Sequence, residues 1–134
     1  MYNKIIVSLS LDHGIGQAAI EAARRLLNEG GKIVAVHVYE PPSSSVSTFL
    51  TEEAIASAFA AAKSRLAERV AVTPDIEGVM LKGHSGRAIT DYAEKTEADC
   101  IIVGSHKPGL RDYLLGSTAA RVVRHAPCSV HVLR

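Results

Sequence analysis

The residues best suited to chemistry lie in one segment near the C-terminus, between Gly104 and Thr118. The segment follows an apolar run, Cys100 to Val103, that is typical of a buried strand, and it ends where a helix is expected to begin. A glycine-bearing loop before a helix is a natural anion site, because its N–H groups can point at phosphate oxygens and the helix dipole favours negative charge. Two cations, Lys107 and Arg111, lie inside the loop. The segment therefore predicts a phosphate-binding loop, and a nucleotide is the leading ligand hypothesis.

A second nucleotide motif competes with the first. Residues 14–19 fit the pattern Gly-x-Gly-x-x-Ala after a strand, and Glu40 follows at the end of the next strand, where a ribose-binding acid is expected. However, Asp12 would place a carboxylate beside the pyrophosphate, Gly14 comes late after the strand, and the sequence offers no second domain to bring a hydride acceptor. A dinucleotide-binding unit is therefore the weaker hypothesis.

Support for enzymatic activity is poor. The sequence has no Gly-x-x-x-x-Gly-Lys-Ser/Thr loop, no nucleophile elbow and no Cys–His pair at a recognisable spacing. Asp12, Glu40 and Asp112 could in principle help to hold Mg²⁺ beside a nucleotide. Cys100 and Cys128 each open an apolar run, which predicts buried thiols that act as small hydrophobes.

Length and composition indicate one domain over residues 1–134. A hydrophobic content of 47% and a charged content of 22% are ordinary for a globular protein, and the net charge of +1 argues against broad attachment to nucleic acid or anionic membrane. No apolar run approaches the roughly 20 residues that span a bilayer, and the N-terminus lacks a signal-peptide layout. We therefore expect a cytoplasmic protein.

Hydrophobic periodicity predicts the elements that position these residues. The expected strands cover residues 5–11, 32–39, 76–81, 99–103 and 129–133. The expected helices cover residues 15–27, 51–70, 85–95 and 117–125. Gly30 and Gly31 are expected to stop the first helix, residues 43–48 to form a polar loop, and Ser85 to cap the third helix. Alternating strands and helices predict an α/β fold with a parallel sheet and helices on both faces. The last strand alternates polar and apolar residues, which suits a sheet edge or a subunit interface.

These residues resemble the universal stress protein family, small α/β proteins that are often dimers. The likeness covers essentially the whole chain and is most specific in residues 102–106, 114–120 and 126–130. Nucleotide-binding members carry Gly-x-x-Gly, nine residues, and then Gly-Ser or Gly-Thr. Here Lys107 stands at the second glycine, and eight residues separate it from Gly116. This resembles a subgroup in which a basic residue and a proline follow Gly-Ser-His, and members of that subgroup also bind ATP.

The resemblance implies a five-stranded sheet of order 3-2-1-4-5, similar to the adenine-nucleotide alpha-hydrolase fold. Ligands of such sheets bind where the strand order reverses, here between the first and fourth strands. Ser10 stands where many members have an aspartate, so it can offer a hydrogen bond without the charge. The predicted nucleotide-binding residues are Ser8, Leu9, Ser10 and Val38 for base and ribose, and Gly104, Ser105, His106, Lys107, Gly109, Arg111, Gly116, Ser117 and Thr118 for the phosphates.

By this resemblance we expect an ATP-binding stress-response or signalling module, with ADP or AMP as other ligands and Mg²⁺ as a companion ion. It also implies a homodimer through the last strand, Ser129 to Leu133, and an unidentified protein partner. Two alternatives stay open. One is an interaction protein of the same fold that binds no nucleotide, and the other is a slow nucleotide hydrolase.

Overall fold

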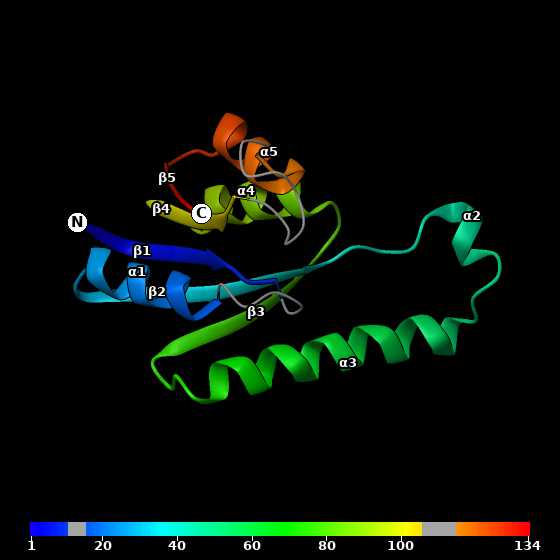
Figure 1. The fold of residues 1–134 in the computed structure, drawn as a ribbon. Helices are drawn as coiled ribbons and strands as arrows, with labels where there is room; N and C mark the ends of the chain where they lie inside the picture. Colours follow the sequence, from blue (N-terminus) through cyan, green and yellow to red (C-terminus); the bar gives the residue numbers. More distant parts are fainter. Residues whose placement is uncertain (11–15, 106–114) are drawn as a thin grey trace.

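The computed structural model describes residues 1–10, 16–105 and 115–134 (Figure 1). Strands and helices alternate along most of the chain, as expected. The elements are β1 (Tyr2–Ser8), α1 (Gly16–Leu26), β2 (Leu27–Tyr39), α2 (Ser44–Ser47), α3 (Glu52–Ala71), β3 (Ile76–Lys82), α4 (Ser85–Lys95), β4 (Cys100–Gly104), α5 (Ser117–His125) and β5 (Ser129–Leu133). None of the helices in these described ranges is long and apolar enough to cross a membrane.

The five strands form one parallel sheet of order β3-β2-β1-β4-β5, which confirms the expected architecture. β1 lies at the centre, and its Ile6 pairs with Val34 of β2 on one side and with Ile101 of β4 on the other. The chain passes from β1 to β2 and β3 on one side, and then returns to place β4 on the other side of β1. The strand order therefore reverses between β1 and β4, and β5 is the edge strand next to β4.

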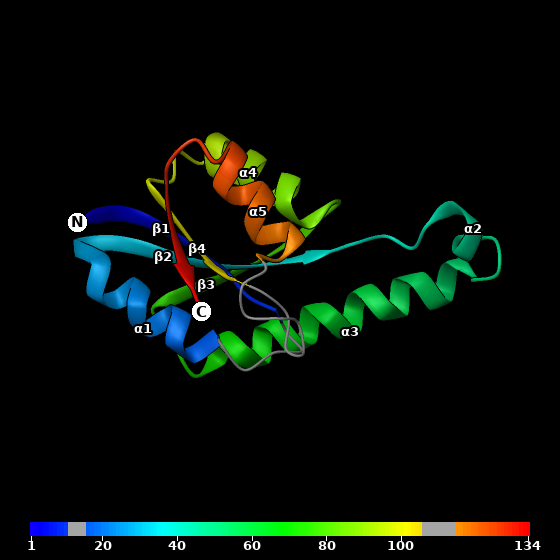
Figure 2. The ribbon, with the colours of Figure 1, turned by 45° about the horizontal axis from the view of Figure 1, so that its top comes forward.

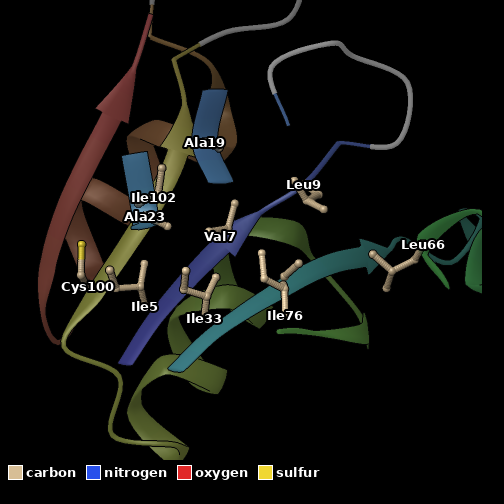
Figure 3. Close-up of a cluster of buried hydrophobic side chains, with 11 residues drawn as sticks. Ile5, Val7, Leu9, Ala19, Ala23, Ile33, Leu66, Ile76, Cys100 and Ile102 are labelled. Atoms are coloured by element: carbon tan, nitrogen blue, oxygen red, sulfur yellow. The ribbon is translucent and has the colours of Figure 1, made fainter. Parts of the chain in front are cut away.

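Helices cover both faces of the sheet (Figures 1 and 2). Successive strand residues point to opposite faces, so the central strand feeds two separate cores. Ile5 and Val7 pack with Ala19 and Ala23 of α1 on the face that α3 also covers (Figure 3). Ile6 packs on the opposite face, with buried residues of α4 and α5. Each fully buried isoleucine or valine contributes about 1.5–3 kcal/mol, so these cores hold the strand ends in place.

The first two strands differ from the prediction at their ends. β1 ends at Ser8 rather than at residue 11. β2 begins at Leu27, directly after α1. Its pairing with β1 shifts from Tyr2–Leu27 to Lys4–Lys32, so Gly30 and Gly31 lie within a bulge of the strand. Gly30 has φ +80°, which favours glycine, and a Cβ on Gly31 would come 2.6 Å from a methyl group of Leu27. The prediction that these glycines stop the first helix was wrong, because α1 ends at Leu26 and both glycines lie inside β2.

Two helix starts also differ from the prediction. Residues 44–47 form the short helix α2 rather than a plain loop. The N-cap of α4 is His84, so Ser85 is the first helical residue and not the cap. The backbone N–H of Ser85 instead donates to Oε1 of Glu40 at 3.0 Å. Glu40, which directly follows β2, thus supplies a hydrogen-bond acceptor at the start of α4, where the Ser85 side chain was expected to provide one.

Candidate functional site

The first part of the predicted site lies where β1 ends. The N–H of Leu9 donates to the carbonyl of Val36 at 2.8 Å, so the backbone stays beside β2 for one residue past the strand. The side chain of Leu9 is only 4% exposed and belongs to the core between α1 and α3. The side chain of Leu9 is therefore taken up largely by core packing. Ser8 and Ser10, on either side of it, are half-buried.

A histidine that sequence reasoning gave no role holds this strand end. Nδ1 of His37 lies 3.0 Å from the carbonyl oxygen of Leu9, so the ring can donate a hydrogen bond to it. The next residue, Val38, points to the other face of the sheet and packs against the core of α4 and α5. Val38 is half-buried, which suits the apolar wall expected of it. In the sequence, the indication of this role was the position of His37 near the end of β2, from which its ring can reach the end of the neighbouring strand β1.

The second part of the predicted site is the end of β4. Gly104 pairs with Leu133 of β5, and the N–H of Ser105 continues the pairing by donating to the carbonyl of Leu133 at 2.7 Å. The N–H of Gly116 in turn donates to the carbonyl of Ser105. The two ends of the predicted phosphate loop are thus joined. The amides of Ser105 and Gly116 already have protein acceptors, so the free donors expected of this loop must come from other residues.

Such donors are present at the start of α5. Gly116 is the N-cap, with φ −60° and ψ 156°, and it offers no side chain to bond the first helical turn. The first helical hydrogen bond runs from the N–H of Ala120 to the carbonyl of Gly116 at 2.8 Å. The amides of Ser117, Thr118 and Ala119 precede that bond, so the helix itself provides no acceptors for them. An uncapped helix N-terminus of this kind attracts anions.

The predicted hydroxyl groups lie at the same place. Ser117 is exposed, whereas Thr118 is half-buried against α4. Oγ1 of Thr118 and Oγ of Ser85 are 2.6 Å apart, so one hydroxyl donates to the other. This bond joins the first turns of α4 and α5, and sequence reasoning did not find it. A hydroxyl group both donates and accepts, so Thr118 keeps hydrogen-bonding capacity for a ligand.

Four predicted site residues, His106, Lys107, Gly109 and Arg111, lie outside the described residues, as do Asp12 and Asp112. Glu40, the other carboxylate considered for Mg²⁺ or for a ribose, is bonded to the N–H of Ser85. In the described part of the chain, His, Cys, Asp and Glu side chains form no group of three or more that could hold a metal ion.

The cysteines agree with their expected packing role. Cys100 is 1% exposed and belongs to the core. Burial raises the pKa of its thiol to about 11, with smaller contributions from Cys128 and Asp99. Cys128 is half-buried, and burial also raises its pKa. A thiol with a raised pKa is mostly protonated at neutral pH and is therefore a poor nucleophile.

Comparison with known proteins finds relatives that match this chain over its whole length. A universal stress protein from Thermus aquaticus is 29% identical over 137 residues that cover all of both chains. Among solved structures, the universal stress protein UspA from Lactobacillus plantarum has 27% identity and a TM-score of 0.73, over 99% of this chain and 98% of that one. A universal stress protein solved in complex with cAMP has 21% identity and a TM-score of 0.63, over 99% and 97% of the two chains, and so shares the fold. The model of the universal stress protein family matches residues 1–134. The chain therefore belongs to the universal stress protein family.

Proposed function

We propose that this protein binds an adenine nucleotide at the sheet edge between β1 and β4, with the phosphates at the N-terminus of α5. The observation that carries the proposal is the start of α5, which Gly116 leaves uncapped beside the end of β4. The reversal of strand order between β1 and β4 supports the same location, because ligands of open α/β sheets bind at such points.

The backbone N–H groups of Ser117 and Thr118, together with their hydroxyl groups, would hold phosphate oxygens. A hydrogen bond to a charged group contributes about 1.5–3 kcal/mol, compared with about 0.3–1 kcal/mol for the helix dipole at an exposed end. Several such bonds, less the cost of association, give about −8 kcal/mol, or micromolar affinity. Lys107 and Arg111, between β4 and α5 in the sequence, would neutralise part of the phosphate charge.

The base and ribose would lie over the end of β1. They would contact the backbone of Ser8 and Leu9, the hydroxyl of Ser10 and the apolar side chain of Val38. The bond between His37 and the carbonyl of Leu9 supports this part, because it fixes the strand end that the base would meet. The solved universal stress protein in complex with cAMP supports an adenine nucleotide as the ligand class.

ATP is the ligand that we propose first, with ADP and AMP as weaker ligands that make fewer phosphate contacts. Mg²⁺ would be bound mainly by the phosphate oxygens, since the described residues provide no metal cluster of their own. We propose binding with at most slow hydrolysis, so that the nucleotide acts as a signal in a stress response.

We also propose that two subunits pair through β5. This strand is at the sheet edge, where one side of its backbone faces away from β4. The same feature favours the second candidate function, a dimeric interaction protein that binds no nucleotide.

The deciding experiment is mass spectrometry of the small molecule that the purified protein releases on denaturation, followed by calorimetric titration with ATP, ADP and AMP. Gly116→Val should abolish ATP binding while the chain stays folded, because φ −60° is open to valine and the branched side chain fills the space that a phosphate would enter. Unchanged ATP affinity in this variant would refute the site. Turnover measured with and without Mg²⁺ separates binding from hydrolysis.

A further inference from the structure

A cationic groove lies beside the proposed nucleotide site, next to the first turn of α4. Its volume is about 700 Å³, and the lining residues that matter here are Lys82, Gly83, His84, Arg87, Asp91 and Arg121. They come from the end of β3, from α4 and from α5, and the two helices lie side by side in both views (Figures 1 and 2). The groove thus opens on an element, α4, that the proposed nucleotide contacts do not use.

The charges that line the groove are unbalanced. The charged groups that face it are the guanidinium groups of Arg87 and Arg121 and the single carboxylate of Asp91, which leaves one positive charge. The carboxylate of Asp91 is 3.7 Å from Nε of Arg87, and both side chains are largely exposed. In the described residues, Arg121 has no carboxylate at ion-pair distance. Nζ of Lys82 lies 4.3 Å from the centre of the Phe59 ring of α3, so its ammonium group does not face the groove.

The position of Arg121 is built into the helix pair. A Cβ on Gly86 would come 2.8 Å from both Cβ and Cδ of Arg121, so the aliphatic part of the arginine lies directly on the first turn of α4. Long helical side chains point back toward the N-terminus of their helix, which directs Arg121 toward the sheet edge. One turn earlier, the bond between Thr118 and Ser85 fixes the same two helices. Gly86 therefore makes room for a cation that has no anionic partner in the described residues.

We propose that this groove is a second anion site, which binds a phosphate group through Arg121 and Arg87. The N–H of Ser85 already donates to Glu40, so the attraction comes from the side chains and not from the start of α4. The phosphate can be inorganic or can be the outer phosphate of a bound nucleotide. The chemistry is the same in both cases: guanidinium groups pair with phosphate oxygens.

The test is a titration with inorganic pyrophosphate at low salt, followed by backbone NMR shifts and calorimetry. We expect shifts in residues 82–88 and in Arg121. Arg121→Gln should weaken binding about tenfold, which corresponds to about 1.4 kcal/mol. Arg124→Gln is the matched control, because Arg124 is exposed on the same helix and does not line the groove. Equal effects of the two variants, or none from Arg121→Gln, would overturn the proposal.

A second variant, at Gly86, keeps the positive charge of Arg121 but displaces its side chain. Gly86→Ala introduces the methyl group that Arg121 now excludes, so it should also weaken pyrophosphate binding, and circular dichroism should show an unchanged fold.

Gly116→Val separates this site from the nucleotide site: it should remove ATP binding and leave pyrophosphate binding in the groove unchanged. Loss of both ligands in Gly116→Val would mean that one site binds both, which also overturns the proposal. A groove that binds pyrophosphate in a protein with no affinity for ATP would refute the nucleotide site alone. Loss of ATP affinity in Arg121→Gln, with AMP affinity unchanged, would identify the nucleotide's outer phosphate as the source of the anion.

Discussion

The backbone of Ser105 links the last residue of β5 to the N-cap of α5. Its N–H donates to the carbonyl of Leu133 at 2.7 Å, and its carbonyl accepts the N–H of Gly116. Ser105 is 4% exposed, so both bonds are shielded from water. The strand proposed for dimerisation and the helix end proposed for phosphate binding therefore share one peptide segment. A change at either place is expected to affect the other, and such coupling is reciprocal in binding free energy.

The first prediction concerns the dimer. His131 is the middle residue of β5, so in a two-fold antiparallel pairing about that residue it faces its own copy. His131→Lys would place two like charges opposite each other and should shift the protein to monomer at micromolar concentration. Sedimentation velocity measures this shift, and His125→Lys, at the exposed end of α5, is the charge-matched control. Because Ser105 joins the two regions, ATP affinity should fall severalfold in the monomeric variant alone. A wild-type protein that sediments as a monomer would eliminate the β5 dimer.

The second prediction uses the N-cap of α5. Gly116→Asp supplies a carboxylate that can accept the N–H groups of the first turn, and the backbone already has the extended conformation of an N-cap. The free energy of unfolding should rise by a few tenths of a kcal/mol, whereas ATP affinity should fall at least about tenfold, because the carboxylate competes with phosphate and repels it. Urea denaturation and calorimetry measure the two effects. A variant that binds ATP as tightly as wild type would place the phosphates elsewhere.

The sequence predicted most of the fold because apolar periodicity and strand burial agree. α5 and β5 have the expected bounds, and the strand order is the one implied by the family resemblance. The errors occur where tertiary contacts override local signals. Gly30 and Gly31 were read as a helix stop, but pairing with β1 draws them into a bulge of β2. Ser85 has the residue type of an N-cap, but Glu40, distant in sequence, supplies the acceptor.

The candidate site was predictable only in part. The start of α5 at Gly116, Ser117 and Thr118 was predictable because glycine and hydroxyl residues before an amphipathic helix have a local signature. Contacts between elements have no such signature. The bond from His37 to Leu9 depends on the register of β1 and β2, and the bond from Thr118 to Ser85 depends on how α4 meets α5. The use of the Ser105 amide by β5 depends likewise on sheet pairing, so sequence reasoning counted it as a free donor.

The third prediction tests the cap of α4. Glu40→Ala removes the acceptor of the Ser85 N–H and should lower the free energy of unfolding by about 1 kcal/mol. Glu40→Gln keeps a carbonyl acceptor without the charge and should lose about half as much. Glu68→Ala, at an exposed position of α3, should change stability by less than about 0.5 kcal/mol. Chemical denaturation of the three variants decides the matter, and equal values for Glu40→Ala and Glu68→Ala would show that the cap contributes nothing.

The last prediction concerns stability at high pH. Burial raises the pKa of Cys100 from 9.0 to about 11, so the folded state keeps the thiol proton that the unfolded state loses. The contribution is fully present below pH 9 and is lost as the pH rises, so that the free energy of unfolding has fallen by about 2 kcal/mol at pH 11. Cys128 and Tyr92, whose pKa values burial also raises, act in the same direction. Cys100→Ala should be less stable at pH 7 because it leaves a small cavity, but its stability should decline less between pH 9 and pH 11. Urea denaturation of wild type and Cys100→Ala across this range measures the two slopes. Parallel slopes for wild type and Cys100→Ala would assign the alkaline loss of stability to other groups.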